Sequence, residues 1–441
     1  MAVIAVTGGK ISTQVGAHYD VVVIGGGAAG LSVITSLLKR QPDLNIALAE
    51  PATEHYYQPG WTLVGGGVFK QADTMKPMAS LIPKQLSWYQ SAASQFAPAQ
   101  NQVTLADDTC LAYRSLIIAT GLSLNWAAIA GLGDNLGSHG ITSNYARGLA
   151  PYTWQLVQQL KQGDALFTQP PMPIKCAGAP QKAMYLSCDH WQRQQVLNNI
   201  NVQFCTAGAA LFGVADYVPA LQHYVNRYGI QLNMQTNLVA VDAASQTAHF
   251  KQPQPDGNSK DIEKRFDMLH ITPPQVAPEV IQHSPLADTA GWVDVYPDTL
   301  QHKAWANVFA LGDCTNTPNA KTAAAVRKQA PVVAENLLSQ LNTKPLRAAY
   351  DGYGSCPLTV ERGKIVLAEF LYGGKVEPTF PKWLVDGTKP ARLSWFLKEK
   401  LLPPLFWYAM LKGHEWLAAP QYRDDIPSDR HAKLSGNFDA S

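Results

Sequence analysis

The sequence has few cysteines, and it lacks the spacings by which cysteines bind structural zinc or frame small secreted domains. Its six cysteines, at positions 110, 176, 188, 205, 314 and 356, are scattered through 441 residues without a CxxC pair. Cys188 and His190 lie close together, but no second pair of metal ligands lies near them in the sequence. We therefore predict no metal site. Most of these cysteines are expected to be buried as small apolar side chains.

Excess charge and long apolar runs are also scarce. Only 15% of the residues are charged and the net charge is +2, far too little positive charge for a nucleic-acid binder. The longest apolar run, Leu401 to Leu411, is interrupted by Pro403 and Pro404 and is too short to span a bilayer. Residues 1–18 lack the basic start and the long apolar core of a secretory signal. We therefore expect no nucleic-acid partner, no transmembrane span and no signal peptide, with a cytoplasmic location as the default.

A dinucleotide-binding pattern is present near the start of the chain. Residues 19–24 are an apolar, β-branched run typical of a buried parallel strand, and they lead into a GxGxxG loop and a helix over residues 28–39. The next expected strand, residues 45–50, ends in Glu50. Such glycines let the backbone approach a pyrophosphate, and the terminal acid can accept hydrogen bonds from ribose hydroxyls. The loop residues predicted to bind the nucleotide are Gly25, Gly27, Ala28, Ala29 and Gly30.

Two later segments indicate that the nucleotide is FAD. Residues 115–121 form an expected strand ending in an Ala-Thr-Gly turn, and residues 308–313 form another ending in Gly-Asp. Both resemble fingerprints of the flavoproteins that contain two dinucleotide-binding domains. The helix expected next, residues 321–338, would stabilise negative charge on the reduced flavin. The residues that this resemblance assigns to the cofactor are Thr120, Gly121, Gly312, Asp313, Lys321 and Thr322.

A second glycine-rich loop is missing where a pyridine-nucleotide site would need one. Residues 164–169 are the expected first strand of a second dinucleotide-type domain, but the chain continues as Pro-Pro-Met-Pro-Ile-Lys-Cys to Cys176. No glycine triplet is available to hold a pyrophosphate, so we predict no NAD(P)H site. Cys176 instead precedes an expected helix and has Lys175 and Lys182 near it, features that favour a reactive thiolate. The alternative is that Cys176 is an ordinary buried cysteine.

The predicted fold is α/β, with two Rossmann-like domains in tandem and a C-terminal membrane-associating region. The FAD-binding domain is expected at residues 19–130 and 285–345, the second domain at 131–284, and the third region at 346–441. In that region, residues 392–412 alternate aromatics, leucines and lysines. This pattern predicts two short amphipathic helices, broken by the Pro403–Pro404 pair, that lie in a membrane interface. The alternative is a helix packed on the core or on a partner subunit.

Three motifs that contain cysteines are similar to one enzyme family. They are Lys-Cys-Ala-Gly-Ala-Pro-Gln-Lys at residues 175–182, Tyr-Gly-Ser-Cys-Pro-Leu-Thr at 353–359, and Gly-Asp-Cys-Thr-Asn-Thr-Pro-Asn-Ala-Lys-Thr-Ala-Ala-Ala at 312–325. They resemble the sulfide:quinone oxidoreductases, in the branch that includes the animal mitochondrial enzymes. Supporting motifs lie at residues 54–60, 143–145 and 267–274.

The resemblance implies a flavoenzyme that oxidises hydrogen sulfide. By position, Cys176 and Cys356 match two catalytic cysteines that form a disulfide near the flavin, and Gln58 matches a residue that contacts FAD. FAD should be bound non-covalently, because residues 122–126 lack the cysteine that tethers it in other branches. The implied partners are sulfide, ubiquinone or a related quinone, a sulfur acceptor such as sulfite, glutathione or cyanide, and a membrane surface. A homodimer and a location on the cytoplasmic face of a bacterial inner membrane are further expectations.

Lysines and aromatic side chains are assigned to the remaining steps. Lys182, Lys398 and Lys400 could stabilise anionic intermediates or the reduced quinone, or they could be ordinary surface lysines. The residues predicted for the quinone pocket are Phe370, Tyr372, Phe396, Lys398 and Trp407, of which one or two could belong to the core. The rival interpretations are a type II NADH:quinone oxidoreductase, a flavocytochrome-type sulfide dehydrogenase, and a redox sensor that holds FAD without turnover.

Overall fold

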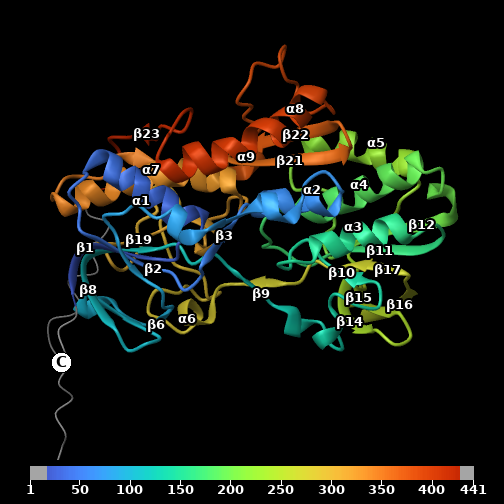
Figure 1. Ribbon diagram of the computed structural model, residues 1–441, viewed down its shortest axis with the longest axis horizontal. Coiled ribbons are helices and arrows are strands. Elements are labelled where there is room, and N and C mark those ends of the chain that lie inside the picture. Colours follow the sequence, from blue (N-terminus) through green and yellow to red (C-terminus); the bar gives the residue numbers. More distant parts are fainter. Residues whose placement is uncertain (1–16, 428–441) are drawn as a thin grey trace, which may run out of the picture.

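The computed structural model places two sheets side by side along the long axis of the molecule, with helices above them (Figure 1). It describes residues 17–427. Residues 1–16, which belong to the segment without a secretory signal pattern, and residues 428–441 lie outside the described part. The C-terminal part of the chain crosses the upper side of both halves (Figure 1).

The first sheet is built around β1 (His18–Ile24), which is parallel to β2 (Ile46–Ala49) on one side and to β8 (Cys110–Ile118) on the other. Residues 21–24 of β1 are buried in a core that includes the apolar side chains of α1 (Ala28–Arg40). The later strand β19 (Val308–Ala310) returns to this sheet and pairs with β8. The other elements of this half include β5 (Ser87–Tyr89), β6 (Ala93–Ala97), β7 (Gln102–Leu105) and α7 (Ala323–Leu341).

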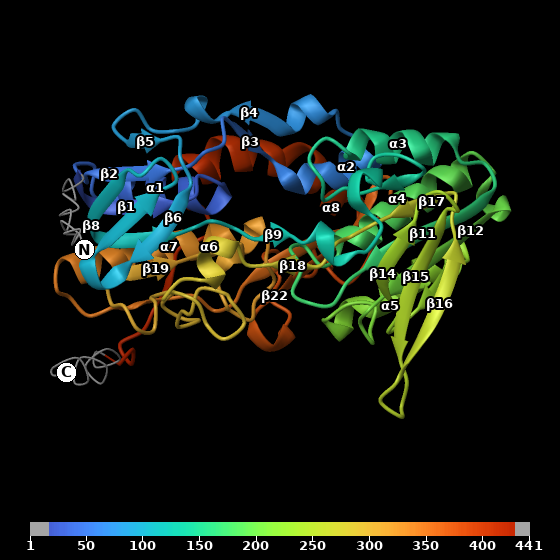
Figure 2. The same cartoon turned by 90° about the horizontal axis from the view of Figure 1, so that it is seen from below.

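The second sheet is wholly parallel, in the order β10-β17-β11-β12-β13. Its central strand β11 (Gly163–Gln169) leads through a loop into α4 (Ala179–Arg193), which is buried along most of its length. The remaining elements are β10 (Ile141–Thr142), β12 (Ile200–Thr206), β13 (Gln231–Asn233), β17 (Met268–His270), α3 (Ala150–Gln159) and α5 (Val218–Tyr228). An antiparallel sheet of β14 (Asn237–Asp242), β15 (Thr247–Pro253) and β16 (Ser259–Arg265) stands at the end of the molecule far from β1 (Figure 2).

The first sheet is parallel around β1 with an antiparallel edge of β6 and β7, and together with the parallel second sheet it confirms the predicted α/β class with two Rossmann-like units in tandem. The helix predicted at residues 28–39 is α1, and the strand predicted at residues 164–169 is β11. Both segments are largely apolar runs that are buried on all sides, as residues 29–38 of α1 and 165–168 of β11 show. The residue limits of the three regions stay a prediction.

The hairpin of β21 (Gly354–Glu361) and β22 (Lys364–Phe370) packs on α4 of the second half. Cys356 and Leu358 of β21 lie in the same apolar core as Met184 of α4. This packing brings the strand that contains Cys356 against the helix that follows Cys176. Two short strands, β20 (Ala348–Ala349) and β23 (Gln421–Tyr422), pair with each other. They connect the segment just before the hairpin to the last part of the described chain.

Residues 392–412 form one helical stretch, so the prediction of two helices broken by Pro403 and Pro404 was wrong. The stretch consists of α8 (Arg392–Phe396), a π turn at Leu397–Leu401, α9 (Leu402–Pro404), a second π turn at Leu405–Ala409, and a 3-10 turn at Met410–Lys412. In a regular α-helix a proline ring clashes with the carbonyl one turn earlier. The wider π turn moves that carbonyl away from the ring, so the helix continues through both prolines.

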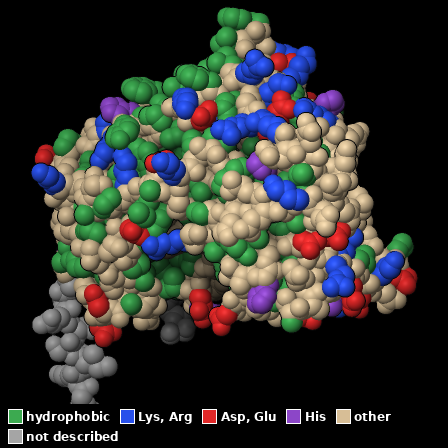
Figure 3. Space-filling view, turned by 45° about the vertical axis from the view of Figure 1, so that its right-hand side comes forward, with side chains coloured by type: hydrophobic (Ala, Val, Ile, Leu, Met, Phe, Trp, Pro, Cys, Tyr) green, Lys and Arg blue, Asp and Glu red, His purple; other side chains and the backbone are tan. Residues whose placement is uncertain are grey.

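This helical stretch, residues 392–412, has an inner and an outer face. Its inner face buries Trp395, Lys398, Phe406, Trp407 and Leu411. Its outer face exposes Leu393, Phe396, Leu401, Leu405 and Tyr408, which we call the outer ridge. Hydrophobic side chains gather along the upper edge of the molecule, with lysines and arginines among them (Figure 3). Within residues 17–427, no helix combines the length and the apolar character needed to cross a membrane.

Gly413 ends the helical stretch against α1, and its replacement tests that contact. Gly413 has a φ of +76°, and a Cβ there would lie 2.8 Å from the carbonyl oxygen of Thr35. Gly373 has a similar φ of +71° but open space around it. Gly373→Ala should lower the free energy of unfolding by about 1–2 kcal/mol for the left-handed backbone alone, and Gly413→Ala should lower it further. Urea unfolding followed by tryptophan fluorescence measures both. Equal midpoints would show that the stretch is not held tightly on α1.

Candidate functional site

The GxGxxG loop lies between β1 and α1, and its three glycines have different surroundings. Gly25 has a φ of +98°, and a Cβ there would lie 2.5 Å from the carbonyl oxygen of Ala119. A Cβ on Gly30 would lie 1.8 Å from the carbonyl oxygen of Gly25, so these two glycines are required by the packing of helix on strand. Around Gly27, no atom of the described residues lies within 4 Å of such a Cβ. The backbone is therefore open at Gly27, as the close approach of a pyrophosphate requires.

Glu50 follows β2 and fixes this loop. Its carboxylate accepts hydrogen bonds from the backbone N–H groups of Gly26 and Ala52, each at 2.7 Å. The bond to Gly26 is a role that sequence reasoning did not identify, because no motif indicates it. The predicted contact of Glu50 with a ribose stays a prediction.

The Ala-Thr-Gly and Gly-Asp turns lie at the ends of the neighbouring strands β8 and β19. These parallel strands pair in register, Ile118 with Ala310, so Thr120 and Asp313 leave the sheet at the same edge. Gly121 has a φ of +69° and open space around it. Burial raises the pKa of Asp313, while the charges of Lys321 and Lys175 oppose that shift. This edge thus places a carboxyl group near two cations beside the open loop.

The start of α7 completes this edge. Thr322 caps the helix, because its hydroxyl oxygen accepts a hydrogen bond from the N–H of Ala325 at 3.2 Å. The amine of Lys321 donates to the carbonyl oxygens of Asp313 and Thr315 at 2.9 and 2.8 Å. Gly312 donates its N–H to the side chain of Gln329 at 2.8 Å. Lys321 therefore braces the Gly-Asp turn through its backbone.

Cys176 and Cys356 meet in the structure, although 180 residues separate them in the sequence. Neither forms a disulfide, and their sulfur atoms are 3.9 Å apart. Gly178 makes the approach possible, because a Cβ there would lie 2.7 Å from the Cys356 sulfur and 2.2 Å from the side chain of Leu358. The predicted helix after Cys176 begins at Ala179. Among residues 17–427, no three His, Cys, Asp or Glu side chains are grouped to hold a metal.

Lys182 is the nearest charge to this thiol pair. Its amine donates to the Cys176 sulfur at 3.1 Å, and the side chain is 1% exposed. The pKa of Cys176 lies well below its usual value, because of its hydrogen bond with Cys356 and the positive charges of Lys182 and Lys398, against the opposing effect of burial. The same hydrogen bond, together with burial, holds the pKa of Cys356 well above its usual value. These opposite shifts favour the thiolate at Cys176 and the thiol at Cys356.

Lys398 reaches the same place from the inner face of the helical stretch 392–412. It is 3% exposed and donates to the carbonyl oxygen of Pro59 at 3.1 Å. Burial lowers its pKa to about 8, the charge of Lys182 lowers it too, and the two cysteines oppose the shift. Lys398, predicted for a quinone pocket, therefore lies within the electrostatic field of the thiol pair.

Gln58 connects the two parts of the site. Its side-chain oxygen accepts a hydrogen bond from the amine of Lys175 at 2.7 Å. Burial lowers the pKa of Lys175, and the charges of Asp313 and Cys176 oppose that shift. Lys175 thus lies between the Gly-Asp turn and the thiol pair, with Gln58 as its hydrogen-bond acceptor. The sequence identified Gln58 and Lys175 separately, but nothing in their positions indicated that they are bonded.

Tyr145 is a site residue to which sequence reasoning gave no role. Its hydroxyl donates to the carbonyl oxygens of Lys175 and Cys176, at 3.0 and 3.2 Å. Cys176 has a φ of +50°, a conformation that costs a residue with a Cβ about 1–2 kcal/mol, and these bonds help to hold it. The Ser-Asn-Tyr motif at residues 143–145 was the only sequence signal of this contact.

The structure does not bring the five predicted quinone residues together. Trp407 packs in an aromatic cluster with His55, Tyr57 and Phe406, with ring centroids 5.6 Å apart for His55 and Trp407 and 4.9 Å for Tyr57 and Phe406. Phe396 lies on the outer ridge. Phe370 instead packs against Phe212, and Tyr372 donates to the carbonyl oxygen of Pro297.

Comparison with known proteins places this geometry in a family. The family model described as pyridine nucleotide-disulphide oxidoreductase matches residues 19–330. A mitochondrial sulfide:quinone oxidoreductase of Dictyostelium discoideum is 41% identical over 398 residues, which cover 89% of this chain and 86% of the relative. The mitochondrial sulfide:quinone oxidoreductase of Mus musculus is 40% identical over 398 residues, which cover 90% of this chain and 87% of the relative.

Solved structures share the fold at lower identity. The sulfide:quinone oxidoreductase of the hyperthermophilic bacterium Aquifex aeolicus aligns over 96% of each chain, with a TM-score of 0.73 and 19% identity. NDH2 of Plasmodium falciparum, solved in complex with NADH, aligns over 88% of this chain and 98% of its own, with a TM-score of 0.62 and 12% identity. The family model and the curated relatives both extend over most of the chain. The chain therefore belongs to the pyridine nucleotide-disulphide oxidoreductases and, within them, to the sulfide:quinone oxidoreductase family.

Proposed function

We propose that this protein oxidises hydrogen sulfide at Cys176 and Cys356 and passes the electrons through a flavin to a quinone. The observation that carries the proposal is the pair of sulfur atoms 3.9 Å apart, with the buried Lys182 amine 3.1 Å from Cys176. A small rotation of either side chain would close such a pair to a disulfide. The names of the curated relatives support sulfide and quinone as the substrates.

The open edge of the first sheet fits FAD. We assign the pyrophosphate to the loop Gly25–Gly30 and the N-terminus of α1, where the backbone is open at Gly27. Asp313 and the open turn at Gly121 would hold the part of FAD between the pyrophosphate and the flavin ring. Bound FAD would accept an electron pair from the thiols and release it to the quinone. Non-covalent binding is part of the proposal, since residues 122–126 contain no cysteine.

The first step opens the disulfide form of the pair. Hydrosulfide attacks one sulfur, the S–S bond breaks, and its electron pair stays on the other sulfur as a thiolate. The cysteine with the lower pKa is the better leaving group. The pKa of Cys176 is held down by the Cys356 hydrogen bond and by Lys182 and Lys398, and the two lysines remain when the disulfide opens. Cys176 therefore leaves as the thiolate and Cys356 carries the persulfide.

The outer sulfur then leaves to a small nucleophile. Sulfite, glutathione or cyanide attacks the terminal sulfur of the persulfide, the S–S bond breaks, and Cys356 regains its thiol. The reduced pair returns to the disulfide when it gives up two electrons and the proton of Cys356. Burial disfavours the charged form of Lys182, but the two cysteines raise its pKa above the usual value. While the pair is reduced, the cysteines thus favour the protonated form of Lys182, whose positive charge faces the Cys176 sulfur.

The aromatic cluster is where we place the quinone head group. Tyr57 lies at its inner side, where burial and the charge of Cys176 both raise its pKa. Phe406 and Trp407 come from the helical stretch 392–412, whose other face carries the outer ridge. A quinone arriving from that side would meet the cluster before it meets the thiol pair. Phe370 and Tyr372 are not part of this proposal.

The outer ridge is the surface that we assign to the membrane. Its leucines and aromatic side chains are exposed, and the amine of Lys76 lies 4.2 Å from the centre of the Tyr408 ring. An apolar strip edged with cations is typical of helices that lie in a membrane interface. We propose peripheral attachment through this ridge. The bacterial inner membrane and a homodimer stay predictions.

Replacement of Cys176 tests the central proposal. In the anaerobic FAD-loaded protein, Cys176→Ser should abolish the fast bleaching of flavin absorbance by sulfide, because no disulfide can form. Cys110→Ser, which changes a half-buried cysteine on β8, is the control and should behave like wild type. Stopped-flow mixing with sulfide, and separately with NADH, makes the measurement. Bleaching by NADH alone, or an unaffected Cys176→Ser rate, would exclude a sulfide-oxidising thiol pair.

The two buried lysines should set the pH at which Cys176 reacts. The lowered pKa of Cys176 means that its thiolate persists to low pH and is lost as the pH falls through that pKa. Lys182→Met removes a charge-assisted hydrogen bond to the Cys176 sulfur. The pH at which Cys176 becomes reactive should therefore rise by about one pH unit or more. Lys398→Met removes a charge that acts on Cys176 without a hydrogen bond to its sulfur, and should move that pH by less. Alkylation rates at Cys176, read by mass spectrometry across pH, check the order. A larger shift in Lys398→Met would contradict it.

Aromatic replacements separate quinone binding from sulfide oxidation. Trp407→Leu should raise the KM for a short-chain quinone, because it opens the aromatic cluster, and should leave flavin bleaching by sulfide unchanged. Phe370→Leu also replaces an aromatic side chain by leucine, but outside the cluster, and should alter neither step. Steady-state quinone reduction and single-turnover bleaching give the two readouts. The quinone would have to be placed elsewhere if Phe370→Leu alone raised the KM.

A further inference from the structure

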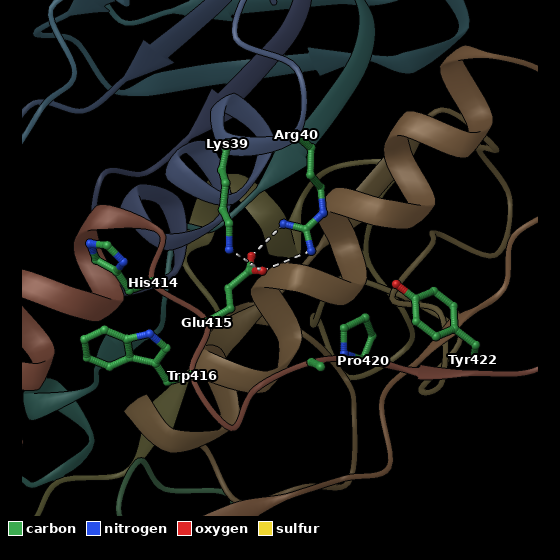
Figure 4. Close-up of a pocket in the computed structure, with 8 residues that line it drawn as sticks. Lys39, Arg40, His414, Glu415, Trp416, Pro420 and Tyr422 are labelled. Carbon is green, nitrogen blue, oxygen red and sulfur yellow. Dashed lines mark hydrogen bonds and ion pairs between the residues drawn. The ribbon is translucent and has the colours of Figure 1, made fainter.

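A cavity of about 330 Å³ lies at the C-terminal end of α1, where the chain leaves the helical stretch 392–412. It is outside the site described above, and no step of the proposed reaction uses it. The residues that line it are Lys39, Arg40, His414, Glu415, Trp416, Ala419, Pro420 and Tyr422. Figure 4 shows Glu415 between Lys39 and Arg40, with Trp416 and His414 on one side and Tyr422 on the other.

The inner wall of this cavity is a closed network of charges. Arg40 donates to Glu335 at 2.8 Å and to the two carboxylate oxygens of Glu415 at 2.6 and 3.1 Å. The hydroxyl of Ser36 donates to Glu415 at 2.5 Å. Both charges of the Arg40–Glu415 pair are therefore satisfied within the protein. This network forms the wall of the cavity. A ligand would therefore be recognised by the side chains at the mouth.

The mouth of the cavity carries hydrogen-bond donors with spare capacity. The Lys39 side chain is 55% exposed and makes one long contact, at 3.4 Å, to Glu415, so it has donors left for a ligand. Trp416 is 63% exposed, and His414 stacks on it with ring centroids 5.3 Å apart. In the described part of the chain, neither the His414 ring nor the Trp416 indole N–H has a hydrogen-bond partner. A cation beside two ring N–H groups is suited to an oxyanion.

The position of the mouth points to the source of that oxyanion. Gly413 joins the helical stretch 392–412 directly to His414, so the cavity lies next to the end of the stretch that carries the outer ridge. Beside the mouth, Leu417 is 70% exposed. An exposed leucine and an exposed tryptophan next to a cation are the arrangement found where side chains enter the boundary between head groups and acyl chains. A soluble phosphate would gain nothing from Leu417.

We infer that this cavity binds the phosphodiester of a membrane glycerophospholipid. Lys39 and the indole N–H of Trp416 donate to the phosphate oxygens, and Leu417 enters the acyl region beside them. The inference rests on the membrane attachment proposed for the outer ridge and adds a specific lipid site to it. Because the recognised group is the phosphodiester, the site does not need a net negative charge on the membrane.

Vesicles of phosphatidylcholine test this site, because they present phosphodiesters without a net surface charge. Lys39→Ala should weaken co-sedimentation of the full FAD-loaded chain by about tenfold, the size of one lost charge-assisted hydrogen bond. Lys400→Ala removes an exposed cation next to the outer ridge, and Lys260→Ala removes one on β16. Both should bind phosphatidylcholine like wild type. Equal binding of Lys39→Ala and wild type would overturn the lipid site, as would equal weakening in Lys400→Ala.

Fluorescence distinguishes a lipid from a soluble ligand. The emission difference between wild type and Trp416→Phe should shift to shorter wavelength with phosphatidylcholine vesicles, because the indole enters the interface. Inorganic phosphate and glycerophosphocholine in solution should leave it unchanged. The same shift with glycerophosphocholine alone would overturn the assignment to a membrane lipid.

Two controls keep this inference separate from the proposed function. The double variant Leu401→Ser, Leu405→Ser should lose vesicle binding, because it removes the centre of the outer ridge. If wild type itself fails to bind vesicles, the membrane attachment and the lipid site are both rejected. The proposed sulfide oxidation is then still tested separately, by the assay in detergent. If wild type binds and Lys39→Ala binds equally, only the lipid site falls. Lys39→Ala should keep the wild-type rate of sulfide oxidation with a short-chain quinone in detergent.

Discussion

The buried hydrogen bond from Lys182 to the Cys176 sulfur is the interaction on which the site depends. An ammonium group 1% exposed is costly to bury without a partner, and the Cys176 sulfur 3.1 Å away supplies that partner. The neighbouring Cys356 thiol and the Lys398 charge act on the same sulfur. Gly178 provides the space for this arrangement. Nothing larger than its hydrogen would let the β21 hairpin approach α4 closely enough to complete the pair.

The helical stretch 392–412 joins the surface of the molecule to this interaction. Its inner face delivers Lys398 to the thiol pair and Trp407 to the aromatic cluster, and its outer face carries the outer ridge. The Gln58–Pro59 segment links these parts, since Gln58 accepts from Lys175 and Pro59 from Lys398.

The local parts of this structure were predictable from the sequence, and the long-range contacts were not. β1, the glycine loop and α1 follow from apolar periodicity and three glycines within a short segment. The meeting of Cys176 with Cys356 came from a family resemblance, because no pattern relates residues 180 positions apart. Nothing in the sequence indicated that Lys398 contacts Pro59. Pro403 and Pro404 misled the helix prediction, because π turns and packing overrode a rule that holds for regular helices.

The burial of Lys182 has a consequence for the redox energetics of the pair. A disulfide carries no charge, so oxidation removes the thiolate and leaves Lys182 and Lys398 buried beside neutral sulfur. The protein therefore stabilises the reduced pair relative to the oxidised one, and the reduction potential of the disulfide is raised. The same lysines that activate a thiolate thus make the disulfide a stronger oxidant. Part of the driving force for oxidising sulfide therefore comes from the buried positive charges of Lys182 and Lys398.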